Sequence, residues 1–284
     1  LTDSYGRAFV VGIVNTVKVV GFGILFASII GLVAGLARLS SNWLVRALAT
    51  VYVELFRNTP LLLQLLFWYG AVILKLPPVR TAVNLFDRVF LSQRGAYIPR
   101  FLPTEDARAW TWFLVAAVVI SGAVYFYRRR QLARTDRPGF PSLWGFGALT
   151  LLLAAGWIVL GAPLTMELPE LQRFNFVGGI QMTPEFTALL LGLSVYTGAF
   201  IAEVVRGGIQ AVDKGQREAA AALGLRPFYI SYLVVIPQAL RTIVPPLTSQ
   251  YLNLAKNSSL AVAIGYPELF NVGTTTMNQT GQTL

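Results

Sequence analysis

The sequence predicts an all-α polytopic membrane protein, and two observations support this. Hydrophobic residues make up 55% of the 284 residues, charged residues only 13%, and the mean hydropathy is +0.60. Since about a quarter of the residues in a soluble domain are charged, this chain has too few charges to cover a water-facing surface. Its apolar runs also reach the ~20 residues that a helix needs to cross a bilayer. We therefore expect the lipid bilayer to be its main solvent.

The formal net charge is +10, and the chain has no histidine and no cysteine. The basic residues lie in short loops between apolar runs, a pattern typical of loops kept on the cytoplasmic side. This distribution argues against nucleic-acid binding, which a basic soluble protein would suggest. Without cysteine there is no disulfide framework and no thiolate metal site. Without histidine the commonest neutral metal ligand is also missing.

Residues 1–76 form a first block with two predicted spans, at about 9–36 and 60–76. Gly31 and Gly35 have the small-xxx-small spacing that lets another helix approach closely, although membrane helices also tolerate glycine without such a role. The apolar stretch 43–76 is too long for one simple span. We read it as a short interfacial helix followed by a span, with Pro60 suited to the first turn of that span.

Residues 77–185 form a second block, read as an insert. Its predicted parts are an extramembrane loop at 77–109 with a short surface helix at 83–91, spans at about 109–127 and 143–160, an arginine-rich loop at 128–139, and a loop at 161–185. The loop 128–139 has five arginines against one aspartate, which places it in the cytoplasm. The acidic loop 161–185 then lies outside. Loop 77–109 is also assigned outside, although its five arginines exceed its three acids.

Residues 186–284 form a third block, with spans at about 186–205 and 228–252 and a final segment. The polar stretch 206–227 between these spans shares the cytoplasmic side with the arginine-rich loop. Its residues 218–223 favour a helix, which Gly224 can end in a left-handed conformation. A new helix is expected to start at Arg226 and Pro227. Residues 255–270 complete the last span or form a partly embedded segment.

One motif in this block is specific. Glu218, Ala219 and Ala220 are followed by three residues, then Gly224, nine more residues, and Val-Val-Ile-Pro ending at Pro237. This resembles the EAA loop of binding-protein-dependent ABC importer permeases, with Val234 and Ile236 replacing the usual Ile and Leu. An alanine-rich cytoplasmic loop with a Gly-Leu-Arg-Pro turn is the alternative. The resemblance implies an ATPase-coupling loop made of Gly215, Glu218, Ala219, Ala220, Gly224, Arg226 and Pro237.

Further stretches resemble the polar amino-acid family of these permeases. They are ELFRNTPLLLQLLFWYG at 54–70, YTGAFIAEVVRGGIQAVDKGQREAA at 196–220, and LAKNSSLAVAIGYPEL at 254–269. The start of the chain, GRAFVVGIVNTVKVV with ARLSSNWLVRA, looks like the long permease subunit of general L-amino-acid transporters. The fold implied is an ABC importer transmembrane domain of the five-span type with two extra inserted spans. Its ends look truncated, and the family's final span is expected to be absent.

The resemblance also implies location, partners and mechanism. We expect a multi-pass protein of the bacterial inner membrane that pairs with a second homologous permease, two ATPase subunits and a periplasmic amino-acid-binding protein. The implied substrate is an L-amino acid, moved by alternating access. The sequence has no G-x-x-x-x-G-K-[ST] loop, so ATP and magnesium are expected on the partner ATPase. No cofactor, metal or catalytic residue is expected on this chain.

Polar side chains within spans are candidates for the translocation path, since they are costly to bury there. They are Gln64, Glu203, Lys256, Asn257 and Ser258. Gln64 can instead bond a neighbouring helix, and Glu203 can pair with Arg206 or Arg57. The inserted spans have almost no hydrogen-bonding side chains and are expected to be peripheral.

Rival functions are an ABC permease for another small polar solute such as an opine or sulfur compound, a secondary transporter or channel, and a membrane enzyme or receptor component.

Overall fold

Glycines set the contact between two long helices of the chain. In the computed structural model, α1 (Thr2–Ala37) packs against α6 (Pro184–Gln210). A Cβ on Gly31 would lie 2.5 Å from the Cβ of Ile201, and one on Gly35 would lie 2.8 Å from the carbonyl oxygen of Ala202. A larger residue at either position would force the helices apart, so the small-xxx-small spacing does mark a helix contact.

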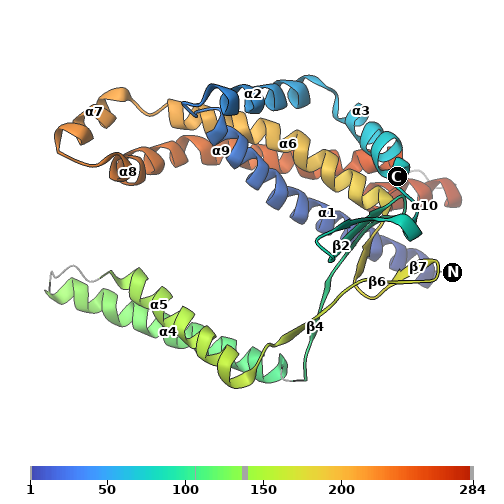
Figure 1. Ribbon diagram of the computed structural model, residues 1–284, viewed down its shortest axis with the longest axis horizontal. Coiled ribbons are helices and arrows are strands. Elements are labelled where there is room, and N and C mark those ends of the chain that lie inside the picture. Colours follow the sequence, from blue (N-terminus) through green and yellow to red (C-terminus); the bar gives the residue numbers. More distant parts are fainter. Residues whose placement is uncertain (1, 106, 136–139, 282–284) are drawn as a thin grey trace. The chain divides into compact units, whose positions relative to one another are not determined.

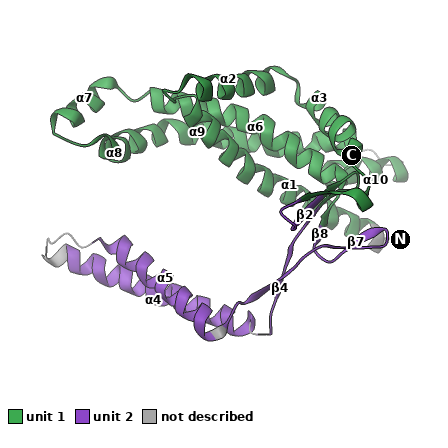
Figure 2. Ribbon diagram, in the orientation of Figure 1, with its two compact units in different colours: residues 1–84, 91–96, 181–284 green, residues 85–90, 97–180 purple. Residues whose placement is uncertain are grey.

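The structure describes residues 2–105, 107–135 and 140–281 (Figure 1). The chain divides into two compact units (Figure 2). Unit 1 comprises Leu1–Asn84, Leu91–Ala96 and Gln181–Leu284, and unit 2 comprises Leu85–Phe90 and Tyr97–Ile180. All of unit 2 falls within residues 77–185, the segment that the sequence reading treats as an insert. The boundaries of that insert stay a prediction.

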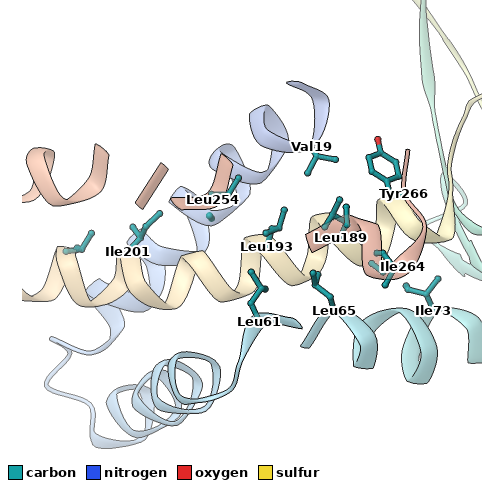
Figure 3. Close-up of a cluster of buried hydrophobic side chains, with 14 residues drawn as sticks. Val19, Leu61, Leu65, Ile73, Leu189, Leu193, Ile201, Leu254, Ile264 and Tyr266 are labelled. Carbon is teal, nitrogen blue, oxygen red and sulfur yellow. The ribbon is translucent and has the colours of Figure 1, made fainter. Parts of the chain in front are cut away.

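The core of unit 1 is built around α6. Leu189 and Leu193 of α6 are fully buried, and Leu61 and Leu65 point at them from the helix below in Figure 3. Leu254 approaches the same cluster from a third helix. Lipid tails are as apolar as these side chains, so their packing stabilises the bundle through close contact and not through removal from water.

Two helices follow α1 in the long apolar stretch, where a short helix and then a span were predicted. Helix α2 (Trp43–Asn58) begins at Asn42, whose Oδ1 accepts from the backbone N–H groups of Leu44 (3.0 Å) and Val45 (3.4 Å). The chain then turns at Thr59 and Pro60 into α3 (Leu61–Leu66), which continues as η1 (Phe67–Val72) and η2 (Ile73–Lys75). Pro60 is the residue before the first turn, not within it as we expected.

The last third of the chain is helical with several interruptions. In order the elements are α7 (Lys214–Ala222), α8 (Pro227–Tyr229), η4 (Ile230–Val235), α9 (Ile236–Asn257), η5 (Ser258–Ile264) and α10 (Leu269–Thr280). Pro237 follows η4 without a break, since Val235 and Ile236 both have helical dihedrals, so its missing N–H removes one bond to the preceding turn. Pro245 and Pro246 lie inside α9. The helix continues through η5 to Ile264 and is broken at Gly265, where φ is +75°. That 255–270 completes the last span or is partly embedded stays a prediction.

Helix α10 follows the YPELF sequence, where no further span was expected. Its twelve residues are too few to cross a bilayer by themselves. Glu268 begins this helix: its carboxylate oxygens accept from the backbone N–H groups of Phe270 (2.9 Å) and Asn271 (2.7 Å). This capping explains why a glutamate is fully buried there, at 2% exposure.

The two loops predicted at 77–109 and 161–185 contain strands, so the all-α expectation was incomplete. After η3 (Val79–Thr81) the strands are β1 (Val83–Leu85), β2 (Val89–Ser92), β3 (Gly95–Ile98), β4 (Arg100–Pro103), β5 (Leu164–Glu167), β6 (Glu170–Gln172), β7 (Asn175–Val177) and β8 (Ile180–Met182). They form a four-stranded sheet in the order β1-β2-β3-β8 and two antiparallel pairs, β4 with β5 and β6 with β7. The prediction of a surface helix at 83–91 is wrong.

Unit 2 contains a helical hairpin, α4 (Ala107–Thr135) and α5 (Pro141–Leu160). The two helices contact where a Cβ on Gly156 would lie 2.4 Å from the Phe113 ring. Trp110 Nε1 donates to the carbonyl oxygen of Gly161 at 3.0 Å and ties the open end of the hairpin. The predicted arginine-rich loop begins as helix, because α4 continues through Thr135; its residues 136–139 lie outside the described part of the chain.

Within the described residues, five helices are long and apolar enough to cross a membrane: Tyr5–Ala37, Ala107–Leu132, Pro141–Val159, Pro184–Gln210 and Pro227–Ile264. Five of our six predicted spans correspond to these helices. The sixth, at 60–76, corresponds to the shorter apolar helix Leu61–Lys75. That α4 and α5 are additions to a five-span pattern stays a prediction.

Candidate functional site

The candidate site begins with the helix-turn-helix between α6 and α9, where the sequence placed the coupling loop. Asp213 begins α7, since its Oδ1 accepts from the backbone N–H of Gly215 at 2.6 Å. Ala220 is buried at 4% exposure, and α7 contacts η4 on that side. Glu218 and Ala219 are exposed on the rest of the helix. The helix thus presents a low, alanine-rich surface that a partner groove can approach.

Gly224 ends α7 in the conformation we predicted, with φ of +76°. The backbone N–H of Leu225 donates to the carbonyl of Ala220 at 3.3 Å, and that of Gly224 donates to Ala221 at 2.9 Å. This pair of bonds is the Schellman arrangement, which favours glycine because other residues are strained at positive φ. Arg226 then precedes α8, and Pro227 occupies its first turn, also as predicted.

Two contacts hold this helix-turn-helix to the long helices. The guanidinium of Arg217 in α7 donates to the carbonyl oxygen of Ile209 in α6 at 2.9 Å. The side chain of Gln238 in α9 donates to Gln216 Oε1 in α7 at 3.5 Å. A force applied to α7 would therefore reach both α6 and α9.

A cluster of ion pairs centred on Glu203 lies in α6, two turns before the end of that helix. The Glu203 carboxylate accepts from Arg38, just beyond the end of α1, and from Arg206 within α6. Arg57 Nη1 lies 3.9 Å from the same carboxylate, and Arg38 Nη2 lies 3.9 Å from Glu54. The ends of α1, α2 and α6 are thus joined by three guanidinium groups and two carboxylates.

The predicted pairing of Glu203 with Arg206 or Arg57 is therefore observed, while Arg38 and Glu54 were missed. The sequence analysis did not single out either residue. A signal was present, because an arginine directly after a long apolar helix needs a partner unless it is fully in water. Its side chain is only 11% exposed, which makes it the most buried cation of the cluster.

Gln64 is buried at 5% exposure and bonds to the preceding segment. Its Nε2 donates to the carbonyl oxygens of Phe56 and Thr59, both at 2.9 Å. These carbonyls end α2, so Gln64 takes the place of the missing helical donors at the α2–α3 turn. Its Oε1 is buried without a partner among the described atoms. The contact with a neighbouring helix, one of our two alternatives, is therefore what the geometry shows.

Lys256, Asn257 and Ser258 lie at the end of α9 and the start of η5. Ser258 is buried, and its hydroxyl donates to the carbonyl of Ala255 at 2.8 Å. Lys256 is exposed. No hydrogen bond or ion pair between described residues joins Gln64, Glu203 and Lys256 to one another, so the path candidates do not form one cluster within this chain.

Tyr52 of α2 was also missed by the sequence reading. Its hydroxyl donates to the carbonyl oxygen of Val195 in α6 at 2.7 Å. Burial raises the pKa of this phenol, so the group stays protonated and keeps the bond. Together with the ion pairs, this contact fixes α2 against α6.

The apolar spans and the helix-turn-helix between the last two of them define a multi-pass transport component of the membrane. The chain belongs to the family described as "Binding-protein-dependent transport system inner membrane component", whose profile matches residues 23–282. This confirms the resemblance carried by the EAA-type motif, the inner-membrane localisation, and the class of ABC permease subunit.

Two relatives agree with this assignment, and one solved structure shares the fold. The chain is 49% identical over 286 residues to YhdX of Escherichia coli strain K12, covering 99% of this chain and 72% of YhdX. It is 49% identical over 283 residues to AapQ, the general L-amino acid transport system permease protein of Rhizobium johnstonii, covering 99% of this chain and 70% of AapQ. A crystal structure of an amino acid ABC transporter with histidines shares the fold, with a TM-score of 0.56 and 22% identity over 99% of this chain and 83% of that chain.

Proposed function

We propose that this permease moves L-amino acids into the cytoplasm by alternating access. It would act with a second homologous permease, two ATPase subunits that bind ATP and magnesium, and a periplasmic amino-acid-binding protein. The general L-amino acid transport named for AapQ supports this substrate class. A permease for another small polar solute is the alternative.

The observation that carries the proposal is the geometry of α7. Its exposed face combines Glu218 and Ala219 with Leu223, whose side chain is 81% exposed. An apolar side chain so open to solvent beside a low helix surface suits a partner contact. Since α7 is bonded to both α6 and α9, movement of a bound ATPase would shift these two helices together. ATP hydrolysis on the partner would in this way be coupled to reorientation of the spans.

For the translocation path, the exposed polar face of α9 is a better candidate than Gln64 or Glu203. Those two residues are held by bonds within this chain, whereas α9 presents Ser249, Asn253 and Lys256 on exposed positions. An amino acid in transit needs polar partners of this kind for its charged ends. The ammonium of Lys256 would pair with the α-carboxylate. Asn257 and Ser258 would support this end of the path through the η5 turn.

Substitutions in the helix-turn-helix test this function. With the partner subunits co-expressed, Gly224→Trp and Glu218→Lys should abolish ATP-dependent uptake of L-amino acids into proteoliposomes, while the complex still reaches the membrane. The bulky residue is strained at positive φ, and the charge reversal breaks contacts at the ATPase surface. The matched control is Glu170→Lys, the same charge change on exposed strand β6, which should leave uptake unchanged.

The rival functions give different outcomes. A secondary transporter would take up substrate from an ion gradient without any ATPase, and both variants would remain active. A permease for another solute would show ATP-dependent uptake of that solute, abolished by the same substitutions, but no uptake of amino acids. Normal uptake by Gly224→Trp with its ATPase attached would contradict the coupling role of α7.

A further inference from the structure

The hairpin of unit 2 encloses a groove that transport does not explain. It lies between α4 and α5 in the half near their connection and has a volume of about 850 Å³. Apolar side chains line most of it, among them Ile120, Val124, Leu143 and Leu151. The two helices contact each other closely at Gly156 and at Gly145, where a Cβ would lie 3.1 Å from the Cβ of Tyr125.

One end of this groove is strongly basic. Arg128 lines it, and Arg129 and Arg130 follow on exposed positions of α4. The Arg128 guanidinium lies 4.3 Å above the ring of Trp144, which lines the groove from α5, and donates to Gln131 Oε1 at 3.3 Å. Residues 107–160 contain six arginines and a single acid, Asp136. The hairpin therefore cannot neutralise this charge by itself.

We propose that this groove binds an anionic phospholipid, with an acyl chain against the apolar wall and the phosphate on Arg128, while Arg129 and Arg130 on the neighbouring faces of α4 add to the positive field at that end. Guanidinium groups suit a phosphate because they donate two parallel hydrogen bonds. An indole such as that of Trp144 is favoured at the level of lipid headgroups. The stacked ring holds the Arg128 guanidinium at the groove, and the N–H groups other than the one donated to Gln131 remain for a phosphate.

The lining argues for a lipid and against a peptide. A helical peptide segment would bring no group that matches the basic end, and a non-helical one would bring unsatisfied backbone N–H and C=O groups against side chains that offer no hydrogen bonds. An acyl chain has no such groups. A zwitterionic lipid would fill the groove equally well, but its positive group would be repelled by Arg128 and by the positive field of the neighbouring Arg129 and Arg130. The charge pattern therefore selects an anionic headgroup.

The arginines also help to orient the hairpin, so the main test leaves them in place. At Gly147, which lines the groove, an added Cβ meets nothing within 4 Å, and the same holds at Gly122 of α4, outside the lining. Gly147→Leu fills the groove without changing charge, and Gly122→Leu adds the same bulk elsewhere. The full complex in nanodiscs of phosphatidylcholine doped with phosphatidylglycerol is examined by native mass spectrometry for retained lipid.

We expect wild type and Gly122→Leu to retain phosphatidylglycerol in preference to phosphatidylcholine, and Gly147→Leu to lose most of this preference. A triple variant, Arg128→Gln with Arg129→Gln and Arg130→Gln, should retain phosphatidylglycerol roughly hundredfold more weakly. Each arginine near an anionic lipid contributes about fivefold, and the three factors multiply. Equal retention of both lipids by wild type would overturn the proposal. Equal loss of phosphatidylglycerol from Gly147→Leu and Gly122→Leu would also overturn it. The same holds if Gly147→Leu releases a protein subunit and keeps its lipid.

Discussion

Arg38, the first residue after α1, donates to the Glu203 carboxylate that Arg206 also binds from within α6. The two partners are 165 residues apart in the chain. Their contact joins the end of the first span to the helix that leads into α7. It is thus the polar contact between α1 and α6 at the end of the bundle where the coupling segment begins.

Replacing Glu203 by glutamine should destabilise unit 1. The neutral side chain leaves Arg38 and Arg206 without their shared carboxylate. Because Glu203 is 29% exposed, we expect a loss of about 1–3 kcal/mol, below the ~3–5 kcal/mol of a fully buried pair. The apparent Tm of the purified complex in detergent measures the change.

Glu54→Gln is the matched control for this prediction. Glu54 belongs to the same cluster, but its side chain is 52% exposed and lies 3.9 Å from Arg38. An exposed pair of this kind contributes less than about 1 kcal/mol. If Glu54→Gln lowers the apparent Tm as much as Glu203→Gln, the central position assigned to Glu203 is wrong.

The contact between Gly31 and Ile201 gives a second prediction. Gly31→Ala would place a Cβ 2.5 Å from two carbons of Ile201 and 2.9 Å from the carbonyl oxygen of Gly198. Such overpacking typically costs about 1–3 kcal/mol, so the apparent Tm should fall. Gly21→Ala on the same helix meets nothing within 4 Å and should leave it unchanged or slightly raised. Equal effects of the two substitutions would contradict close packing of α1 on α6.

The helices were predictable because hydropathy over about 20 residues is a strong signal. The end of α7 was predictable because Gly224 follows an alanine-rich run and precedes Arg-Pro. The strands were not predicted, since VNLFDRVFLS at 83–92 combines apolar and charged residues in a way that also suits a surface helix. Phe86 and Asp87 instead adopt positive φ, 58° and 55°, which turns the chain into a hairpin.

The polar contacts were harder to predict than the helices. Sequence spacing shows neighbours within one helix, such as Glu203 and Arg206, but it does not show which distant helix end comes close. The bond from Tyr52 to Val195, 143 residues apart, was missed for this reason. Gln64 was identified as unusual within an apolar run, but its partners depend on the turn at Thr59 and Pro60, which composition does not specify.

The orientation of the hairpin gives a third prediction. The five arginines at 128–139 resist translocation, so a cysteine in place of Gln131 should be unreachable by an impermeant thiol reagent in intact cells. The chain has no native cysteine, so any labelling reports the introduced one. Gln172→Cys, exposed on β6 in the loop predicted outside, should react. Ready labelling at position 131 would show that the predicted topology is reversed from Ala109 onward.

The fourth prediction separates structural polar groups from those of the translocation path. Gln64→Met removes the donors to Phe56 and Thr59 and leaves their carbonyls unpaired, so it should cost about 1–3 kcal/mol of stability. Lys256→Gln changes an exposed side chain without a bonded partner among the described residues, so the apparent Tm should stay unchanged. If its ammonium meets the substrate carboxylate, uptake should weaken roughly tenfold, equivalent to about 1.4 kcal/mol.

Uptake and apparent Tm measured on the same preparations distinguish these roles. We expect Lys256→Arg to restore much of the uptake because it keeps the positive charge, whereas Lys256→Met should not. Alanine substitutions on α4 and α5, such as Val118→Ala and Leu151→Ala, should leave substrate preference unchanged because these side chains offer no polar contact. If these two substitutions change substrate preference while Lys256→Gln does not, the translocation path runs along α4 and α5, and its assignment to α9 is wrong.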